Sequence, residues 1–309
     1  KKVFKSDPSL TNAILRKVVK NKNDLKLKKT NFDLLPTWFK LNVNDWNNNT
    51  KINFLDSIRL QPELNIVFKK EEDLKKFEIE GISTSFKSIS LSSFENIASL
   101  PGYKEGTWWV QDYSAMLPIF LINKISHKKI IDMCCAPGGK AFQILAQNEN
   151  LIMYEINQKR ASILKLNLQR LNYKTEIFVE DSLKINEEKK YDIVLLDAPC
   201  SSVGTIRRHP EIFFREEIID VNYYTNIQKQ LLEKASKLVK KNGFILYMVC
   251  SFLKSETNQQ INKFIKKNKN CYYIKSFGRD DYLSCLKLSN VIIGNSSSGI
   301  IEAPSFKTL

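Results

Sequence analysis

The sequence contains only two histidines, His127 and His209, and its six cysteines form no C-x-x-C pair. Structural zinc sites use closely spaced cysteine and histidine ligands, so we expect no metal ion. The cysteines also lack the spacing of a disulfide framework, and we expect free thiols in a reducing cytoplasm. The longest apolar runs, residues 114–122 and 244–250, are much shorter than the roughly 20 residues that cross a bilayer. We expect neither a membrane span nor a cleavable signal.

Acidic residues are the minority among the charged residues. Asp and Glu total 33 against 48 Lys and Arg, which gives a formal net charge of +15 over 309 residues. The hydrophobic fraction of 43% is enough for a sizeable core and excludes a disordered chain. The basic excess favours a polyanionic partner, with nucleic acid ahead of a membrane surface.

The composition changes along the chain and predicts four segments. Residues 1–30 carry ten basic and two acidic residues and are expected to form a basic helical segment. This basic segment could be either an RNA-binding arm or a helix with a solvated charged face. Residues 31–105 contain short strand-like stretches at 64–68, 77–79 and 89–91 and are expected to form a small α+β subdomain. Residues 106–277 are expected to form the catalytic domain, and residues 278–309 a tail of different character.

The third segment alternates apolar, β-branched runs with amphipathic helical stretches. The strands are expected at 129–133, 151–154, 175–179, 191–196 and 243–249, and the helices at 141–147, 159–171 and 226–240. Strands that are apolar at nearly every position are typical of a parallel sheet covered on both faces. The sequence therefore predicts an α/β, Rossmann-like doubly wound fold, with ligands at the carboxyl ends of the strands.

A glycine-containing loop follows the first of these strands. It reads Asp132-Met133-Cys134-Cys135-Ala136-Pro137-Gly138-Gly139-Lys140 and leads into a helix. The glycines allow a ligand to approach the backbone, and the helix start and Lys140 favour a negative group. The spacing is neither that of a phosphate-binding P-loop nor that of a dinucleotide site.

Two acidic residues end the next two predicted strands. Glu155 lies 17 residues after Gly138, where this fold places an acid that binds ribose hydroxyls. Asp181 ends the third strand, in a position to contact an adenine. The alternative is that both are surface carboxylates.

The fourth and fifth strands each lead to a cysteine. Asp197-Ala198-Pro199-Cys200-Ser201-Ser202 closes the fourth and Val249-Cys250-Ser251 closes the fifth. A buried cysteine is usually a small apolar side chain, and this alternative holds for each residue taken alone. Two thiols at the ends of adjacent parallel strands, beside Asp197, instead predict a catalytic crevice.

Together these motifs resemble the RNA (cytosine-5) methyltransferases, most closely the bacterial 16S rRNA methyltransferase B group. That group has a D-x-C-A-A-P-G-G-K loop, a D-A-P-C-S segment continuing into R-R-H-P, and a T-C-S. Cys135 replaces the first Ala of the loop, residues 197–210 keep the second motif, and Val249 replaces the Thr of the third. Residues 109–115 also resemble the V-Q-D-x-S-A stretch that precedes the family's core.

The resemblance implies a class I methyltransferase fold and S-adenosylmethionine as cofactor. It implies Cys250 as the nucleophile that attacks carbon 6 of cytosine, Cys200 as the group that assists proton removal and release, and Asp197 as the residue that contacts the base. The opposite assignment of the two thiols stays open, because DNA cytosine-5 methyltransferases use the Pro-Cys thiol. The implied cofactor-binding residues are Cys134, Cys135, Ala136, Pro137, Gly138, Gly139, Lys140, Glu155, Asp181 and Asp197.

The resemblance implies RNA as the substrate, small-subunit rRNA in particular, and residues 31–105 as a subdomain that contacts it. Carbon 5 is reached only when the base leaves its stack, so a flipped nucleotide in a loop or unwound strand is expected. Arg207, Arg208 and His209 are the candidate RNA-binding residues, with a capped surface loop as their alternative interpretation. Trp108 and Trp109 are expected in the core.

Both ends of the chain depart from this family. Residues 278–309 resemble a fragment of the UDP-N-acetylglucosamine 2-epimerases, through residues 295–305, and are expected to be a fused or mis-assembled segment. Residues 10–20 resemble only the end of a NusB-like RNA-binding domain, and the chain begins with Lys1, so a fragment is expected. We expect a cytoplasmic monomer that methylates RNA. The alternative is a non-catalytic RNA-binding or ribosome-assembly protein that retains the fold.

Overall fold

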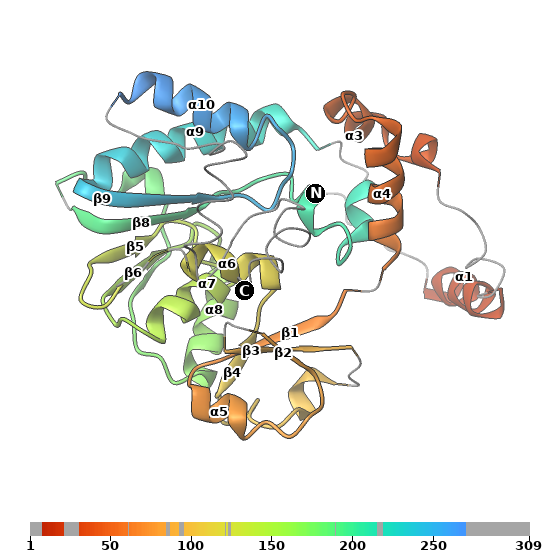
Figure 1. Ribbon diagram of the computed structural model, residues 1–309, viewed down its shortest axis with the longest axis horizontal. Coiled ribbons are helices and arrows are strands. Elements are labelled where there is room, and N and C mark those ends of the chain that lie inside the picture. Colours follow the sequence, from red (N-terminus) through yellow and green to blue (C-terminus); the bar gives the residue numbers. More distant parts are fainter. Residues whose placement is uncertain are drawn as a thin grey trace, which may run out of the picture.

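Two β-sheets and their helices form the part of the chain that the structure, a computed structural model, describes (Figure 1). It describes residues 8–21, 31–60, 62–84, 87–92, 96–120, 122, 125–188, 190–214 and 219–269. The predicted tail at residues 278–309 lies outside the described residues.

The larger sheet has five strands in the order β7-β6-β5-β8-β9, and every described pair in it is parallel. This confirms the predicted doubly wound, Rossmann-like fold. The third predicted strand is shorter than expected, because β7 is an edge strand that pairs only with β6. The strands are β5 (Ile130–Asp132), β6 (Leu151–Tyr154), β7 (Ile177–Phe178), β8 (Tyr191–Asp197) and β9 (Val239–Met248).

Helices cover both faces of this sheet, because neighbouring residues of each central strand point to opposite sides. Ile130 and Ile193 pack with α7 and α8 in one core cluster, whereas Ile131 and Val194 pack with α9 in a second. Figure 1 shows α9 and α10 on one side of the strands and α7 and α8 on the other. The helices are α6 (Tyr113–Phe120), α7 (Gly139–Leu145), α8 (Gln158–Arg170), α9 (Val221–Leu238) and α10 (Asn258–Lys267).

The smaller sheet is antiparallel, has the order β2-β3-β1-β4, and packs around the fully buried Trp108. The strand predicted at residues 77–79 is wrong. Phe77 donates its N–H to the Leu74 carbonyl at 3.1 Å, which closes a turn after α5, and its ring packs 5.2 Å from that of Phe68. The elements are β1 (Leu64–Phe68), α5 (Glu71–Lys75), β2 (Ile82–Thr84), β3 (Ser88–Leu91), η2 (Ile97–Ser99) and β4 (Trp108–Val110).

The end of α8 joins the two sheets. The Arg170 guanidinium lies 4.4 Å from the Tyr103 ring centroid and donates to the carbonyls of Tyr103 and Trp108, each at 3.0 Å. Lys69 reaches the Leu171 carbonyl at 2.5 Å. Both cations therefore replace water at backbone oxygens that the junction would otherwise leave without donors.

An aromatic cluster supports the loop that follows β8. Phe39 is fully buried, and its ring lies 5.0 Å from that of Phe213 and 5.4 Å from that of Phe54. The cluster joins the amino-terminal helices to residues just beyond the predicted D-A-P-C-S motif. Its elements are η1 (Phe32–Leu34), α3 (Thr37–Asn42), α4 (Asn48–Arg59), η4 (Val203–Thr205) and η5 (Pro210–Phe214).

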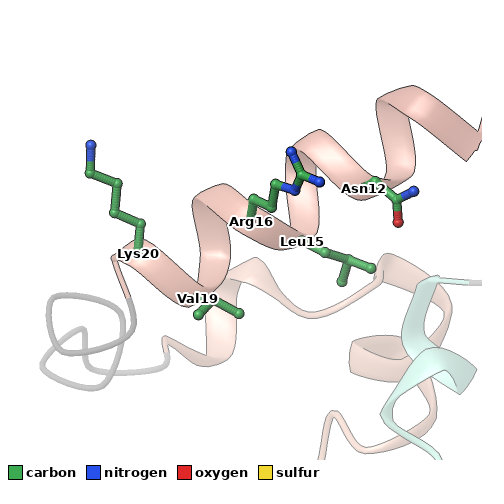
Figure 2. Close-up of a pocket in the computed structure, with 5 residues that line it drawn as sticks. All are labelled: Asn12, Leu15, Arg16, Val19 and Lys20. Atoms are coloured by element: carbon green, nitrogen blue, oxygen red, sulfur yellow. The ribbon is translucent and has the colours of Figure 1, made fainter.

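The predicted basic helix is present as α1 (Pro8–Lys20) and stands apart from the other elements in Figure 1. Leu15 and Val19 are exposed at 55% and 72%. Figure 2 shows that they line a shallow hollow with Asn12, Arg16 and Lys20, all on this one helix. The hollow is therefore a side of α1, separate from the crevice at the strand ends.

Candidate active site

The glycine-containing loop leaves β5 and begins α7. Gly138 has φ +114°, and a Cβ there would come within 2.4 Å of the Phe142 ring and 2.5 Å of the Leu164 side chain. Only glycine fits this backbone conformation in this space. The Cys135 N–H donates to the Tyr154 carbonyl at 3.0 Å, which fixes the loop against the end of β6. Ala136 and Pro137 complete this loop before Gly138.

The surroundings of the two cysteines in this loop disfavour their thiolate forms. Burial raises the pKa of both Cys134 and Cys135, and the Asp132 carboxylate raises them further. Cys135 is buried in the core cluster beside α7. The loop therefore offers a ligand its backbone rather than its thiols.

Glu155, which follows β6, has one carboxylate oxygen free to accept a hydrogen bond. The side chain is 2% exposed, and Oε1 accepts the Asn157 N–H at 2.8 Å. Oε2 is buried without a hydrogen-bond partner, although Arg160 Nη1 lies 3.4 Å away in an ion pair. A buried acceptor of this kind at a strand end fits the ribose hydroxyls of a nucleoside cofactor.

Asp181 does not end a strand, since β7 stops at Phe178. Its Oδ1 accepts the Leu183 N–H at 3.0 Å and caps the turn η3 (Ser182–Lys184). The Ser182 hydroxyl donates to the Met133 carbonyl, so this turn lies against the glycine-containing loop. Asp181 thus lies at the predicted edge of the sheet, but one of its oxygens is already used.

Lys140 and Asp197 form the ion pair at the centre of the site. Lys140 Nζ lies 2.5 Å from Asp197 Oδ2, with the side chains 11% and 25% exposed. Burial opposes the charge of Lys140, but the Asp197 carboxylate outweighs it and raises the Lys140 pKa. Burial also raises the pKa of Asp132 to about 7, and the nearby Asp197 contributes to this shift. The Lys140 cation therefore offsets two carboxylates in a small volume.

The two predicted catalytic cysteines meet at the ends of β8 and β9. Cys250 is exposed and Cys200 is half-buried. The Ala198 N–H donates to the Met248 carbonyl at 2.9 Å, and the Gly204 N–H donates to the Cys250 carbonyl at 3.0 Å. A Cβ at Gly204 would lie 3.1 Å from that same carbonyl oxygen, so the small residue permits the close approach of the two loops.

The thiols have opposite acidities. A hydrogen bond from Cys200 lowers the Cys250 pKa, and Lys140 lowers it further. The same hydrogen bond, together with burial, raises the Cys200 pKa. The arrangement thus favours a Cys250 thiolate that accepts a hydrogen bond from the Cys200 thiol.

The loop with Arg207, Arg208 and His209 follows Gly204, whose N–H bonds the Cys250 carbonyl. Arg208 Nε lies 2.7 Å from Asp112 Oδ2, and Nη2 donates to the Glu63 carbonyl at 2.9 Å. His209 Nδ1 lies 3.0 Å from Glu211 Oε1. Arg207 and His209 are exposed, whereas Arg208 is half-buried and joins the loop to the smaller sheet.

Two groups of buried polar side chains were not predicted. Gln111 accepts from Trp109 Nε1 at 2.8 Å and donates to Gln143 Oε1 at 2.6 Å, directly beneath Gly139. Trp109 and Gln111 lie in residues 109–115, and the resemblance of that stretch to the family was the one sequence feature that pointed to this group. The second group surrounds Glu256, a single acidic residue in a stretch without any recognisable motif.

Residues 119–282 match the 16S rRNA methyltransferase RsmB/F family, just over half of the chain. The chain belongs to that family. The ribosomal RNA small subunit methyltransferase B of Photorhabdus laumondii is 36% identical over 196 residues, which cover 62% of this chain and 46% of that protein. The protein of the same name from Yersinia enterocolitica is 34% identical over 204 residues, covering 64% of this chain and 48% of its own length. This chain of the RsmB/F family thus spans about half the length of those relatives.

A solved structure supports the fold of this RsmB/F chain. A methyltransferase homologue from Pyrococcus horikoshii superimposes with a TM-score of 0.61 at 24% identity, over 72% of this chain and 75% of that one. Family and fold together support S-adenosylmethionine as the cofactor. Of the helices that the structure describes, none is long and apolar enough to span a bilayer. Within the same residues, no cluster of three or more His, Cys, Asp and Glu side chains could hold a metal ion.

Proposed function

We propose that this chain transfers a methyl group from S-adenosylmethionine to carbon 5 of a cytosine in RNA, and that the RNA is small-subunit rRNA. The observation that carries the proposal is the exposed Cys250 thiol, made more acidic by Cys200, beside the Lys140–Asp197 pair. Carbon 5 of cytosine is too weak a nucleophile to take a methyl group directly, so a thiolate must first add to carbon 6.

The first role belongs to Cys250, whose thiolate forms a bond to carbon 6. As the thiolate adds, N3 takes a proton from water, and Asp197, held by Lys140, accepts a hydrogen bond from this N3/N4 edge. The N3 proton returns to water when the adduct breaks down. S-adenosylmethionine, when bound, supplies the electrophilic methyl group for carbon 5. The loop backbone around Gly138, Lys140 and Glu155 would hold it at the carboxyl ends of β5 and β6, within the unit of residues 106–277.

Cys200 acts after the attack. Bond formation consumes the Cys250 thiolate, and with it the hydrogen bond that raises the Cys200 pKa. Cys200 can then lose its proton to water and accept the proton from carbon 5. The double bond between carbons 5 and 6 re-forms as the bond between Cys250 and carbon 6 breaks, which regenerates the thiolate. Two thiols of opposite acidity at one edge of the sheet suit these two steps.

The loop that follows the Cys200 motif supplies the residues proposed to bind RNA. Arg207 and His209 are exposed beside the crevice and are proposed to contact phosphates of the flipped nucleotide. Arg208 remains a candidate for the same role, although Asp112 already holds its guanidinium. Val249, which replaces the family's Thr, packs partly against the core cluster of α9, and the Cys250 thiol beside it is exposed.

The test uses the purified chain, labelled S-adenosylmethionine and a small-subunit rRNA transcript. We expect label in RNA, recovered as 5-methylcytosine by mass spectrometry of the nucleosides. A transcript containing 5-fluorocytosine should form an adduct that survives denaturing electrophoresis, because fluorine at carbon 5 blocks proton removal. RNA binding without methylation or adduct would instead support the non-catalytic RNA-binding alternative.

Replacing Glu155 with glutamine should weaken cofactor binding by roughly 10- to 100-fold, the value of one charge-assisted hydrogen bond. The amide removes the charge of the buried acceptor that faces the proposed ribose site. Titration calorimetry with S-adenosylhomocysteine measures the affinity. Glu180→Gln, at an exposed position after β7, is the matched control and should bind normally. Equal affinities of the two variants would refute this site.

A further inference from the structure

Glu256 is a fully buried carboxylate six residues after Cys250, in the turn before α10. Its two carboxylate oxygens accept hydrogen bonds from uncharged groups. Oε1 accepts from the Ser201 N–H at 2.9 Å and from Gln228 Nε2 at 3.0 Å, and Oε2 accepts from the Ser201 hydroxyl at 2.5 Å. No lysine or arginine of the described chain forms an ion pair with it. Burying a charge is costly unless hydrogen bonds or a counter-ion compensate, and among the described residues these three hydrogen bonds are the compensation that Glu256 has.

The hydrogen bonds of Glu256 lead to the residues that follow the two cysteines in the sequence. Ser201 follows Cys200, and its hydroxyl lies 3.2 Å from the hydroxyl of Ser251, which follows Cys250. The Glu256 carbonyl accepts the Tyr247 hydroxyl at 2.9 Å, which ties the same turn to the end of β9. The Cys200 loop is therefore bound to the Glu256 carboxylate, and the Cys250 loop is joined to it through the Ser201 hydroxyl and the Glu256 backbone carbonyl.

We propose that Glu256 is a positioning residue that holds the Cys200 loop against the Cys250 loop and keeps Cys200 as the protonated member of the pair. The inference rests on the proposed function for its consequence in methylation, but its effect on the thiols can be measured without RNA. Beside the hydrogen bond to Cys250 and burial, the Glu256 charge also raises the Cys200 pKa. A negative charge next to one thiol disfavours its thiolate and leaves the other thiol to ionise first.

Two substitutions separate the effect of the Glu256 charge from the effect of its side-chain length. Glu256→Gln keeps the length of the side chain: its amide oxygen can accept from the Ser201 N–H, and the Ser201 hydroxyl can turn to accept from the amide. Glu256→Asp keeps the charge but is one methylene too short to maintain all three hydrogen bonds. Glu233→Gln on α9 is the matched control, because it removes the same charge at a partly exposed position that pairs with Lys267.

The measurement is alkylation by iodoacetamide across a range of pH, with each cysteine quantified by mass spectrometry. In the wild type, Cys250 should react at lower pH than Cys200. In Glu256→Gln, Cys200 should be alkylated at lower pH than in the wild type, because one of the charges that raises its pKa is gone. Glu256→Asp should keep the Cys200 midpoint but lower methylation by about 10-fold, because the loops separate. Glu233→Gln should match the wild type in both assays.

An unchanged Cys200 midpoint in folded Glu256→Gln would overturn the inference. If that variant does not fold, Glu256→Asp decides, and its full methylation would overturn the inference too. A wild-type protein that forms no adduct with 5-fluorocytosine RNA would refute the proposed function instead, while the alkylation comparison would still decide the role of Glu256 on the thiols.

Discussion

Replacing Cys250 with serine should abolish methylation, by at least about 1,000-fold, and should abolish the adduct with 5-fluorocytosine RNA. A serine hydroxyl ionises far less readily than a thiol, so the attack on carbon 6 loses roughly 4 kcal/mol of transition-state stabilisation. Because Cys250 is exposed, the melting temperature should stay close to that of the wild type. Methyl transfer to rRNA and adduct formation on denaturing gels are the two measurements.

Cys200→Ser is the matched variant and should behave in the opposite way. It leaves the Cys250 thiol to attack but removes the group that takes the carbon 5 proton. An adduct with ordinary RNA should therefore accumulate, with methylated cytosine trapped in it. The reverse pattern, an adduct in Cys250→Ser and none in Cys200→Ser, would exchange the roles of the two thiols and contradict the acidities inferred from their hydrogen bond.

The parallel sheet was predictable because its strands are apolar on both faces. Residues 64–68 and 151–154 were placed with the bounds of β1 and β6, since turn-forming and polar residues border each run. The stretch at 77–79 was misassigned for a physical reason. Its apolar residues Phe77 and Ile79 pack on the smaller sheet from a turn, and two apolar side chains in alternation do not distinguish a turn from a strand.

The motif residues of the site were also predictable, because parallel strands bring their carboxyl ends to one edge. Cys200, Cys250 and Asp197 therefore meet as expected. What the sequence could not reveal is how polar groups at that edge pair with one another. Arg208 is held by Asp112, 96 residues earlier, and Glu256 holds Ser201, 55 residues earlier. Such partners lie on different elements, so no local spacing indicates them.

Lys140→Met should lower methylation by about 100-fold and make Cys250 harder to ionise. Methionine keeps much of the side-chain volume but removes the cation that faces Asp197, Asp132 and Cys250. Loss of one preorganised charge costs about 2.7 kcal/mol in the transition state. Because a nearby cation favours a thiolate, its removal raises the Cys250 pKa, and iodoacetamide should alkylate Cys250 only at higher pH. Rates of methyl transfer and alkylation profiles test both effects.

The pH dependence of the stability of the folded chain should also depend on the charges of Lys140 and Asp132. The Asp132 pKa is raised to about 7 from an ordinary 3.8, so the folded chain binds its proton more tightly than the unfolded chain, and stability falls as pH rises through this range. Lys140 limits that fall. Lys140→Met should therefore be less stable than the wild type by about 2 kcal/mol at pH 8, with a smaller difference at pH 5.

Lys234→Met is the control: its side chain is also 11% exposed and pairs with Glu187 at 3.1 Å, away from the thiols. Equal losses of methylation in both variants, with an unchanged Cys250 alkylation profile, would show that Lys140 acts on the fold rather than on the thiolate.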